Sequence, residues 1–159
     1  MKIQVRRIVG SDDLELLTQR INTAQWDAGN DIDGYQVDAL RTYLADDDHL
    51  FVAAFVGEDP PELGGIAAAR IERKPYEDFR WLYIDEVDTC VNFRRRGVGK
   101  ALMTFLLESA RGRGCQEAWL GTEHANLAAN TLYRSLQPAH VESVIGYTYE
   151  LNSDASLDQ

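Results

Sequence analysis

The chain has 159 residues, a formal net charge of −10 at pH 7 and a hydrophobic content of 45%. This length and composition predict a single globular domain with a substantial core. The acidic charge argues against a nucleic-acid partner, because that binding depends on neutralising phosphates. The longest uncharged apolar run, residues 50–57, is far shorter than the roughly 20 residues that cross a bilayer.

The amino terminus lacks the apolar core of a signal peptide, so we expect a cytoplasmic protein. Cys90 and Cys115 are too few to suggest a disulfide framework or a metal site. The acidic loop at residues 27–34 does not have the spacing of a calcium-binding loop. We therefore expect no metal and no membrane partner, with one domain over residues 1–151 and a flexible tail over residues 152–159.

The first half of the chain alternates between strand-like and helix-like patterns of apolar residues. The predicted elements are, in order, a strand at residues 2–8, a helix from a cap at Ser11 to about residue 26, a helix at 36–45, and strands at 50–56, 63–73 and 80–91. The strands at 50–56 and 63–73 are expected to pair as a hairpin.

The second half contains the clearest helix, in which apolar residues recur at helical spacing from Val98 and which ends near Gly112. It is followed by a predicted strand at residues 116–121, a short helix at 126–136 and one or two strands within 141–151. This order predicts an α/β fold, with a mixed sheet of about six to seven strands and helices on both faces.

The segment Arg94-x-x-Gly97-x-Gly99 joins a predicted strand to that helix. Glycines allow a positive φ and a close approach of ligand to backbone. The first N–H groups of a helix have no partners within the helix, and the helix dipole adds positive charge there. The turn is therefore predicted to bind an anion such as a diphosphate. Ala101 and Leu102 exclude a P-loop and a dinucleotide-binding fingerprint, respectively.

This Arg/Gln-x-x-Gly-x-Gly/Ala pattern, placed between a strand and an amphipathic helix, resembles the acetyl-CoA signature of the GNAT N-acetyltransferases. The predicted order of elements over residues 3–151 is also that of the GNAT fold. The resemblance implies acetyl-CoA as co-substrate, with its pantetheine arm bound by a bulged strand segment at residues 87–89. The cofactor-binding residues that it implies are Val87, Thr89, Arg94, Arg95, Arg96, Gly97, Val98, Gly99, Lys100, Asn126 and Tyr133. For each arginine of the turn, an equally good alternative is that its side chain is solvated and does not contact the cofactor.

Asn126 and Tyr133 are seven residues apart and so share one face of a helix. In the family, the asparagine contacts the cofactor arm and the tyrosine hydroxyl protonates the departing CoA thiolate, as a general acid. The alternatives are a plain helix cap for Asn126 and a core aromatic side chain for Tyr133.

Asp85, Glu86 and Asp88 lie on the strand before the turn. An amine acceptor must lose a proton before it attacks, and a carboxylate near the thioester can take that proton. We favour Glu86 as the base or amine anchor and Asp88 second, and we expect all three acids to bind the substrate. On a regular strand Asp85 would face away from the other two, although a bulge would alter this. The alternative is a solvated acidic face.

Within the family, residues 83–87 and the Arg-Arg-Arg-Gly run are similar to the type I aminoglycoside 3-N-acetyltransferases. This implies transfer of an acetyl group to a primary amine of a cationic small molecule, by direct attack in a ternary complex, in a homodimeric enzyme of antibiotic resistance. Gln137 departs from the family, which has glycine there, and so one wall of the acceptor pocket is in question. The alternatives are a polyamine, protein or peptide acceptor, or a non-catalytic acyl-CoA-binding module.

Overall fold

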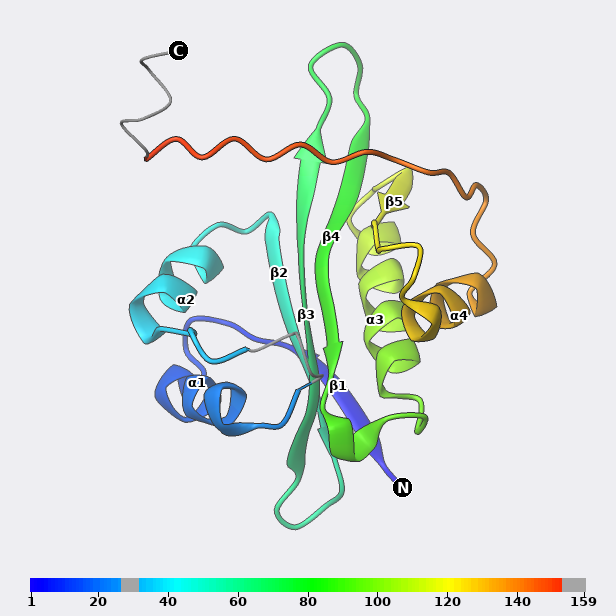
Figure 1. Cartoon of the computed structure of the whole chain (residues 1–159). Coiled ribbons are helices and arrows are strands. Elements are labelled where there is room, and N and C mark those ends of the chain that lie inside the picture. The colour runs from blue at the N-terminus through cyan, green and yellow to red at the C-terminus, as the bar shows by residue number, and fades with distance from the viewer. Residues whose placement is uncertain (27–31, 153–159) are drawn as a thin grey trace.

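The computed structural model describes residues 1–26 and 32–152, and its strands form one sheet in the order β1-β2-β3-β4-β5 (Figure 1). The strands are β1 (Ile3–Arg7), β2 (His49–Val56), β3 (Glu62–Arg73), β4 (Arg80–Thr89) and β5 (Glu117–Trp119). The first four pair antiparallel and β5 is parallel to β4, so the sheet is mixed. The α/β class is confirmed, but the described residues form five strands rather than six to seven.

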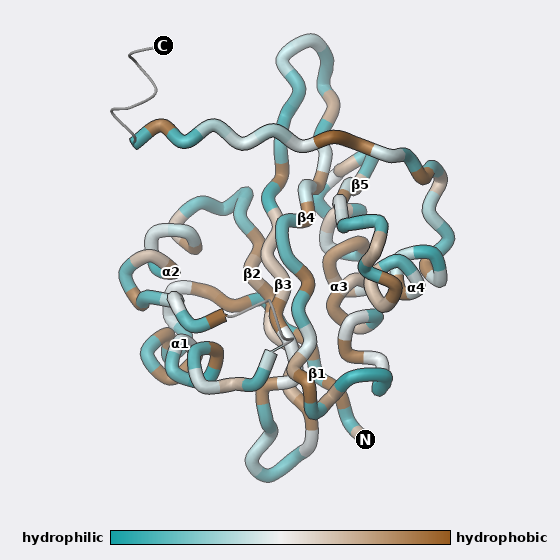
Figure 2. The backbone as a smooth tube through the Cα atoms, viewed as in Figure 1, coloured by the Kyte–Doolittle hydropathy of each residue, from teal (hydrophilic) through white to brown (hydrophobic). Residues whose placement is uncertain are grey.

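The helices are α1 (Leu14–Thr23), α2 (Val37–Leu44), α3 (Val98–Gly112) and α4 (Leu127–Ser135). Helices α1 and α2 cover one face of the sheet and α3 covers the other (Figure 1). Figure 2 shows hydrophobic residues along the central strands and α3. None of the helices in the described part of the chain has the length and apolar character of a membrane span.

Two hydrophobic clusters lie on opposite faces of the sheet. On the α3 side, Leu82, Leu102 and Leu106 are each 0% exposed. On the side of α1 and α2, Ile21 and Ile66 are also 0% exposed. The central strands are therefore buried on both faces, which explains why β2 reads as a continuous apolar run.

The start of α1 differs from the prediction. Its cap is Asp13, whose carboxylate accepts a hydrogen bond from the Leu16 N–H at 3.0 Å. Ser11 lies before the helix, because Asp12 folds back and accepts hydrogen bonds from the Val9 N–H and from Arg6, each at 2.7 Å. The preceding residues are thereby held in a turn rather than in the first turn of the helix.

Residues 141–151 contain none of the strands that were predicted there. They run as an extended segment whose large apolar side chains are exposed (Figure 1). Among the described residues, no strand pairs with this segment. The last strand of the sheet, β5, pairs only with β4 and over only three residues. The predicted tail beyond residue 152, and most of the acidic loop at 27–34, lie outside the described residues.

Gly65 of β3 lies where the sheet meets the first turn of α3. A Cβ atom at this position would lie 2.7 Å from the main-chain oxygen of Asp88 and 2.9 Å from Cγ1 of Val98. The absence of a side chain therefore lets the start of α3 pack directly on β3 and β4. This contact positions the turn that precedes the helix.

We expect Gly65→Ala to lower the free energy of unfolding by about 1–3 kcal/mol, because the added methyl group overpacks this junction. Urea denaturation measures the change. Gly112→Ala is the matched control, since no atom lies within 4 Å of the Cβ position there. A Gly65→Ala variant as stable as the control would show that α3 can move aside freely.

Candidate active site

Strands β4 and β5 separate after a short paired stretch. Their register runs from Trp81 opposite Glu117 to Tyr83 opposite Trp119, whereas β4 continues to Thr89. From residue 84 onward, this edge of β4 has no β5 partner within the described chain. Backbone N–H and C=O groups on such an edge can bind an extended ligand.

The bulge in β4 lies at Asp85. Ala69 of β3 pairs with Ile84 and Ala68 pairs with Glu86, so Asp85 is the extra residue. The prediction of a bulge at residues 87–89 is wrong, because these residues pair in regular register with β3. A bulge changes the direction in which neighbouring side chains point. Here it leaves Asp85 and Glu86 both exposed.

The two acids lie on the side of the sheet that carries α1 and α2. The Asp85 carboxylate forms an ion pair with Arg70, which also pairs with Glu72 at 2.8 Å. Burial raises the pKa of Tyr43 on α2 to about 12, and the negative charges of Asp85 and Glu86 contribute to the rise. Asp85 would face away from Glu86 on a regular strand, but the bulge breaks that alternation and places both acids on one side.

Glu86 has a partner that the sequence did not reveal. The Tyr35 hydroxyl donates a hydrogen bond to Oε2 of Glu86 at 3.3 Å. Asn22 of α1 holds the Tyr35 backbone, donating to its carbonyl at 2.9 Å and accepting from its N–H at 3.0 Å. Residues 35 and 86 are far apart along the chain, so no sequence pattern could have linked them. Tyr35 orients the carboxylate that was favoured as base or anchor.

Tyr35 remains protonated at neutral pH. Burial raises its pKa, and the nearby charges of Glu86 and Asp88 raise it further. The hydroxyl therefore serves Glu86 as a neutral hydrogen-bond donor. A neutral donor orients the carboxylate without cancelling its charge, so the carboxylate remains able to attract an ammonium group.

The predicted anion-binding turn has the backbone expected of it. Arg95 has a φ of 58°, and Gly97, the N-cap of α3, has a φ of 88°. A Cβ at Gly97 would meet no atom within 4 Å, so the backbone conformation, not space, favours glycine there. The side chains of residues 94–96 and of Lys100 are exposed at the start of the helix. They add positive charge to the part of the chain where the first N–H groups of the helix have no partner within the helix.

Helix α4 meets this turn and the end of β4. A Cβ at Gly99 would lie 2.9 Å from Cδ2 of Leu132 on α4 and 3.6 Å from Oγ1 of Thr89. The hydroxyl of Tyr133, on the same helix, is held neutral, because burial and then the charge of Asp88 raise its pKa. The structure therefore brings Tyr133 into the neighbourhood of β4, as a general acid would require.

Asn126 serves as the N-cap of α4. Its side-chain oxygen accepts a hydrogen bond from the Ala129 N–H at 3.1 Å. In this structure Asn126 is therefore a helix cap, which was the alternative to a contact with the cofactor arm. Val87 is half-buried and pairs with Ala67 of β3, so its side chain contributes to the sheet while its backbone lies beside the separated strands.

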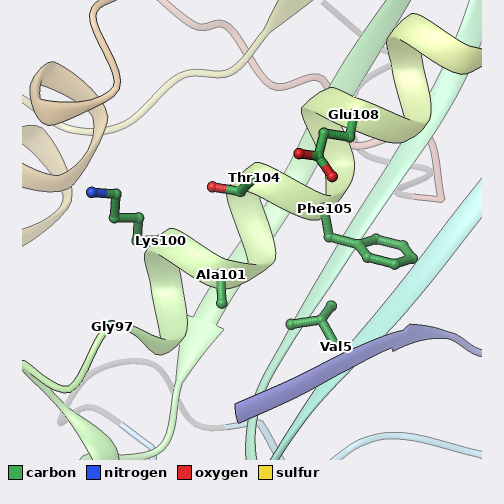
Figure 3. Close-up of a pocket in the computed structure, with 7 residues that line it drawn as sticks. All are labelled: Val5, Gly97, Lys100, Ala101, Thr104, Phe105 and Glu108. Atoms are coloured by element: carbon green, nitrogen blue, oxygen red, sulfur yellow. The ribbon is translucent and has the colours of Figure 1, made fainter.

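A hollow of about 470 Å³ lies between β1 and α3 (Figure 3). It is lined by Val5, Gly97, Lys100, Ala101, Thr104, Phe105 and Glu108. Gly97 and Lys100 connect it to the anion-binding turn, but the acids of β4 and Tyr133 do not line it. It is therefore distinct from the place where the acids gather. Among the described residues, no group of three His, Cys, Asp or Glu side chains could hold a metal ion.

The family model described as the acetyltransferase (GNAT) family matches residues 15–137. The chain belongs to this family of acetyltransferases, whose members use acetyl-CoA. The match covers β4, the Arg94–Lys100 turn, α3 and α4, and so includes every element that builds the candidate site.

The chain is similar to individual family members over different lengths. It is 30% identical over 99 residues to N-acetyltransferase family 8 member 3 of Mus musculus, a match that spans 62% of this chain and 42% of the mouse protein. It superimposes with a TM-score of 0.79 and 20% identity on an aminoglycoside acetyltransferase from an uncultured soil metagenomic sample in complex with trehalose, covering 94% of this chain and 96% of that one.

A second structure of the soil enzyme, in complex with sisomicin, gives a TM-score of 0.76 at 18% identity, again with 94% of this chain and 96% of that one covered. AAC(6′)-Iy, in complex with the bisubstrate analog CoA-S-monomethyl-acetylneamine, gives a TM-score of 0.71 at 20% identity, covering 94% of this chain and 99% of that one. At these identities the comparisons show a shared fold. The acceptor must be argued from the residues of this chain.

The raised pKa values of Tyr35 and Tyr43 predict a loss of stability at alkaline pH. Both phenols bind their protons more tightly in the folded chain than in the unfolded chain, where tyrosine titrates near about pH 10. Their contribution to the free energy of unfolding is fully present below about pH 10. It is lost as the pH rises through the higher pKa values that the two groups have in the folded chain. We expect the free energy of unfolding to fall by up to about 1.4 kcal/mol per pH unit for each group, measured by urea denaturation above about pH 10.

Tyr35→Phe should make this fall shallower, because it removes one of the two groups. Tyr76→Phe is the control: its side chain is 74% exposed, so the slope should remain that of the wild type. Identical slopes in the wild type and Tyr35→Phe would contradict the assigned burial of the Tyr35 hydroxyl beside Glu86.

Proposed function

We propose that this acetyltransferase moves an acetyl group from acetyl-CoA to a primary amine of a cationic small molecule, an aminoglycoside acetylated at its 3-N position. The observation that carries the proposal is the acidic surface formed by Asp85, Glu86 and Asp88 on one strand, beside the point where β4 and β5 separate. Carboxylates gathered beside the donor site favour an acceptor with several ammonium groups.

The donor site is built largely from backbone. The Arg94–Lys100 turn binds the diphosphate of acetyl-CoA through the first N–H groups of α3, with the exposed arginines and Lys100 adding positive charge. Residues 84–89 of β4 present an edge that β5 leaves unpaired, and their backbone binds the pantetheine arm. An N–H of this edge stabilises the thioester oxygen as it becomes negative.

The chemistry is direct attack in a ternary complex. Glu86 takes one proton from the substrate ammonium, and the neutral nitrogen then forms a bond to the thioester carbon. As the carbon–sulfur bond breaks, the Tyr133 hydroxyl gives its proton to the thiolate. One of the two protons left on the nitrogen passes to the tyrosinate or to solvent, and the other stays as the N–H of the amide product. Tyr133 suits this role because its raised pKa keeps it protonated.

The wider properties of the chain support a polycationic acceptor. Its net charge of −10 attracts cations and accelerates their capture. Two fold neighbours carry ligands of this class or an analog of the reaction, one with sisomicin and one with a CoA-linked neamine derivative. We further propose a cytoplasmic, homodimeric enzyme that confers antibiotic resistance.

We expect Glu86→Gln to lower kcat/KM for the amine by about 10²-fold or more, because the amide can neither accept the proton nor attract the ammonium. Acetyl-CoA affinity, measured by calorimetry, should stay at the wild-type value. Glu117→Gln is the control, since Glu117 is an exposed acid of the neighbouring strand β5 that lies opposite Trp81, away from Glu86. Equal loss of turnover and acetyl-CoA binding in Glu86→Gln would argue against a specific role on the acceptor.

An acceptor screen tests the choice of substrate. Release of free thiol from acetyl-CoA should be fastest with aminoglycosides, and mass spectrometry with NMR of the product should place the acetyl group on the 3-amino nitrogen. Faster turnover of a polyamine or a peptide amine would support the acetyltransferase activity but contradict the choice of an aminoglycoside as acceptor. Stabilisation by CoA without turnover of any amine would identify a non-catalytic acyl-CoA-binding module instead.

A further inference from the structure

A row of aromatic side chains lies on the sheet next to the acids of β4. The ring centroids of Trp81 and Tyr83 are 5.8 Å apart, and that of Trp119 on β5 is 5.7 Å from Tyr83. Leu82, between the first two, packs in the cluster on the α3 side, so the rings lie on the opposite side of the sheet. This is also the side of the acids in the candidate active site. The rings of Trp81 and Tyr83 are only half-buried.

Two positively charged side chains lie over these rings. Nζ of Lys74 is 4.2 Å from the ring centroid of Trp81 and 5.5 Å from that of Tyr83. Cζ of Arg70 is 5.2 Å from the Tyr83 centroid. A cation within about 6 Å of an aromatic ring is attracted to its electron-rich face, most strongly for tryptophan. The rings of Trp81 and Tyr83, here called the aromatic face, therefore bind positive charge in this structure.

The two cations are held in different ways. Arg70 is fixed by ion pairs with Glu72 and Asp85, so it is part of the sheet surface. Lys74 begins the loop between β3 and β4, which extends beyond the helices at the top of Figure 1. None of the ion pairs among the described residues includes Lys74. The aromatic face therefore holds its ammonium group, and a flexible four-carbon side chain can leave that face readily.

We propose that the aromatic face is a second ammonium-binding subsite of the acceptor, and that Lys74 occupies this subsite until an acceptor displaces it. A primary ammonium group on a small molecule has the charge and the size of the end of a lysine side chain. Four residues of strand, about 13 Å, separate the middle of the face from Glu86. An acceptor with ammonium groups at such a spacing places one at Glu86, where it reacts, and another on the aromatic face.

The presence of Lys74 makes the subsite selective for acceptors with several ammonium groups. Such an acceptor, once bound at Glu86, presents its next ammonium group to the aromatic face at a high effective concentration and displaces Lys74. A monoamine bound at Glu86 leaves Lys74 in place. The inference rests on the proposed function for the amine that reacts, and it adds the place where a second amine binds.

The first experiment detects the subsite without acetyl transfer. Tetramethylammonium ion, titrated into the isotope-labelled full chain, should shift the indole N–H resonance of Trp81, which is assigned by its loss in Trp81→Phe. Lys74→Met should lower the half-saturating concentration about two- to fivefold, because the competing ammonium is gone. The indole of Trp26, which donates to the Ile21 carbonyl at 2.9 Å, is the internal reference and should not respond. A Trp81 resonance that responds in neither chain overturns the proposal.

The second experiment connects the subsite to the acceptor. With CoA bound and no acetyl group present, calorimetry should show that sisomicin binds Lys74→Met about two- to fivefold more tightly than the wild type, and Trp81→Leu at least twofold more weakly. In the Trp81→Leu background, Lys74→Met should have no further effect, because the shared ring is gone. Arg73→Met is the matched control: it removes the adjacent positive charge, which pairs with Asp48 at 4.0 Å, and should change the affinity less than Lys74→Met does.

The outcomes distinguish this inference from the proposed function. Equal affinity of sisomicin for the wild type and Lys74→Met, with no response of the Trp81 indole, would leave the acceptor as proposed and overturn the second subsite. A Trp81 response to tetramethylammonium in a chain that binds no aminoglycoside would support the ammonium subsite and contradict the choice of acceptor. Circular dichroism confirms that each variant is folded, and Trp81→Phe, with a weaker ring, should give an affinity between those of the wild type and Trp81→Leu.

Discussion

The separation of β4 from β5 is the feature on which the rest of the candidate site depends. Neighbouring strands of a sheet form hydrogen bonds to each other through their backbone N–H and C=O groups. These groups become available to a ligand only where the strands separate. The two strands pair through Tyr83 and Trp119 and no further. Close packing at Gly65 and Gly99 then sets α3 and α4 against the free part of β4. This one divergence therefore leaves the backbone edge at which we propose that the donor binds, and α4 carries Tyr133 near the same part of β4.

The acidic surface depends on a second local irregularity. Because Asp85 is an extra residue in β4, two adjacent acids face the side of α1 and α2. They are held differently: Asp85 forms an ion pair with Arg70, whereas Tyr35 gives Glu86 only a neutral hydrogen bond. A carboxylate that keeps its charge but has a fixed orientation can attract and deprotonate an ammonium group. The difference in partners, not in residue type, favours Glu86.

The sheet of the described residues ends at β5, and this end is thinly covered. A sheet that ends on a three-residue strand leaves backbone groups and aromatic rings with incomplete cover. Residues 141–151 are extended and expose large apolar side chains. The turn at Gln137, where the family has glycine, lies between α4 and this extended segment.

The sequence by itself determined most of the elements, their order along the chain, the hairpin of β2 and β3, and the glycine turn before α3, because these depend on residue periodicity and on glycine at positions such as Gly97. The sequence misplaced the cap of α1, because the cap depends on which of two adjacent acids accepts the helix N–H. The resemblance misplaced the bulge, because its position depends on the register between β3 and β4. It predicted strands in residues 141–151 from their alternation, but alternation cannot supply the neighbouring strand. Only the tertiary structure decided that Tyr35 holds Glu86 and that Asp85 faces Arg70, because these contacts join residues far apart in the chain.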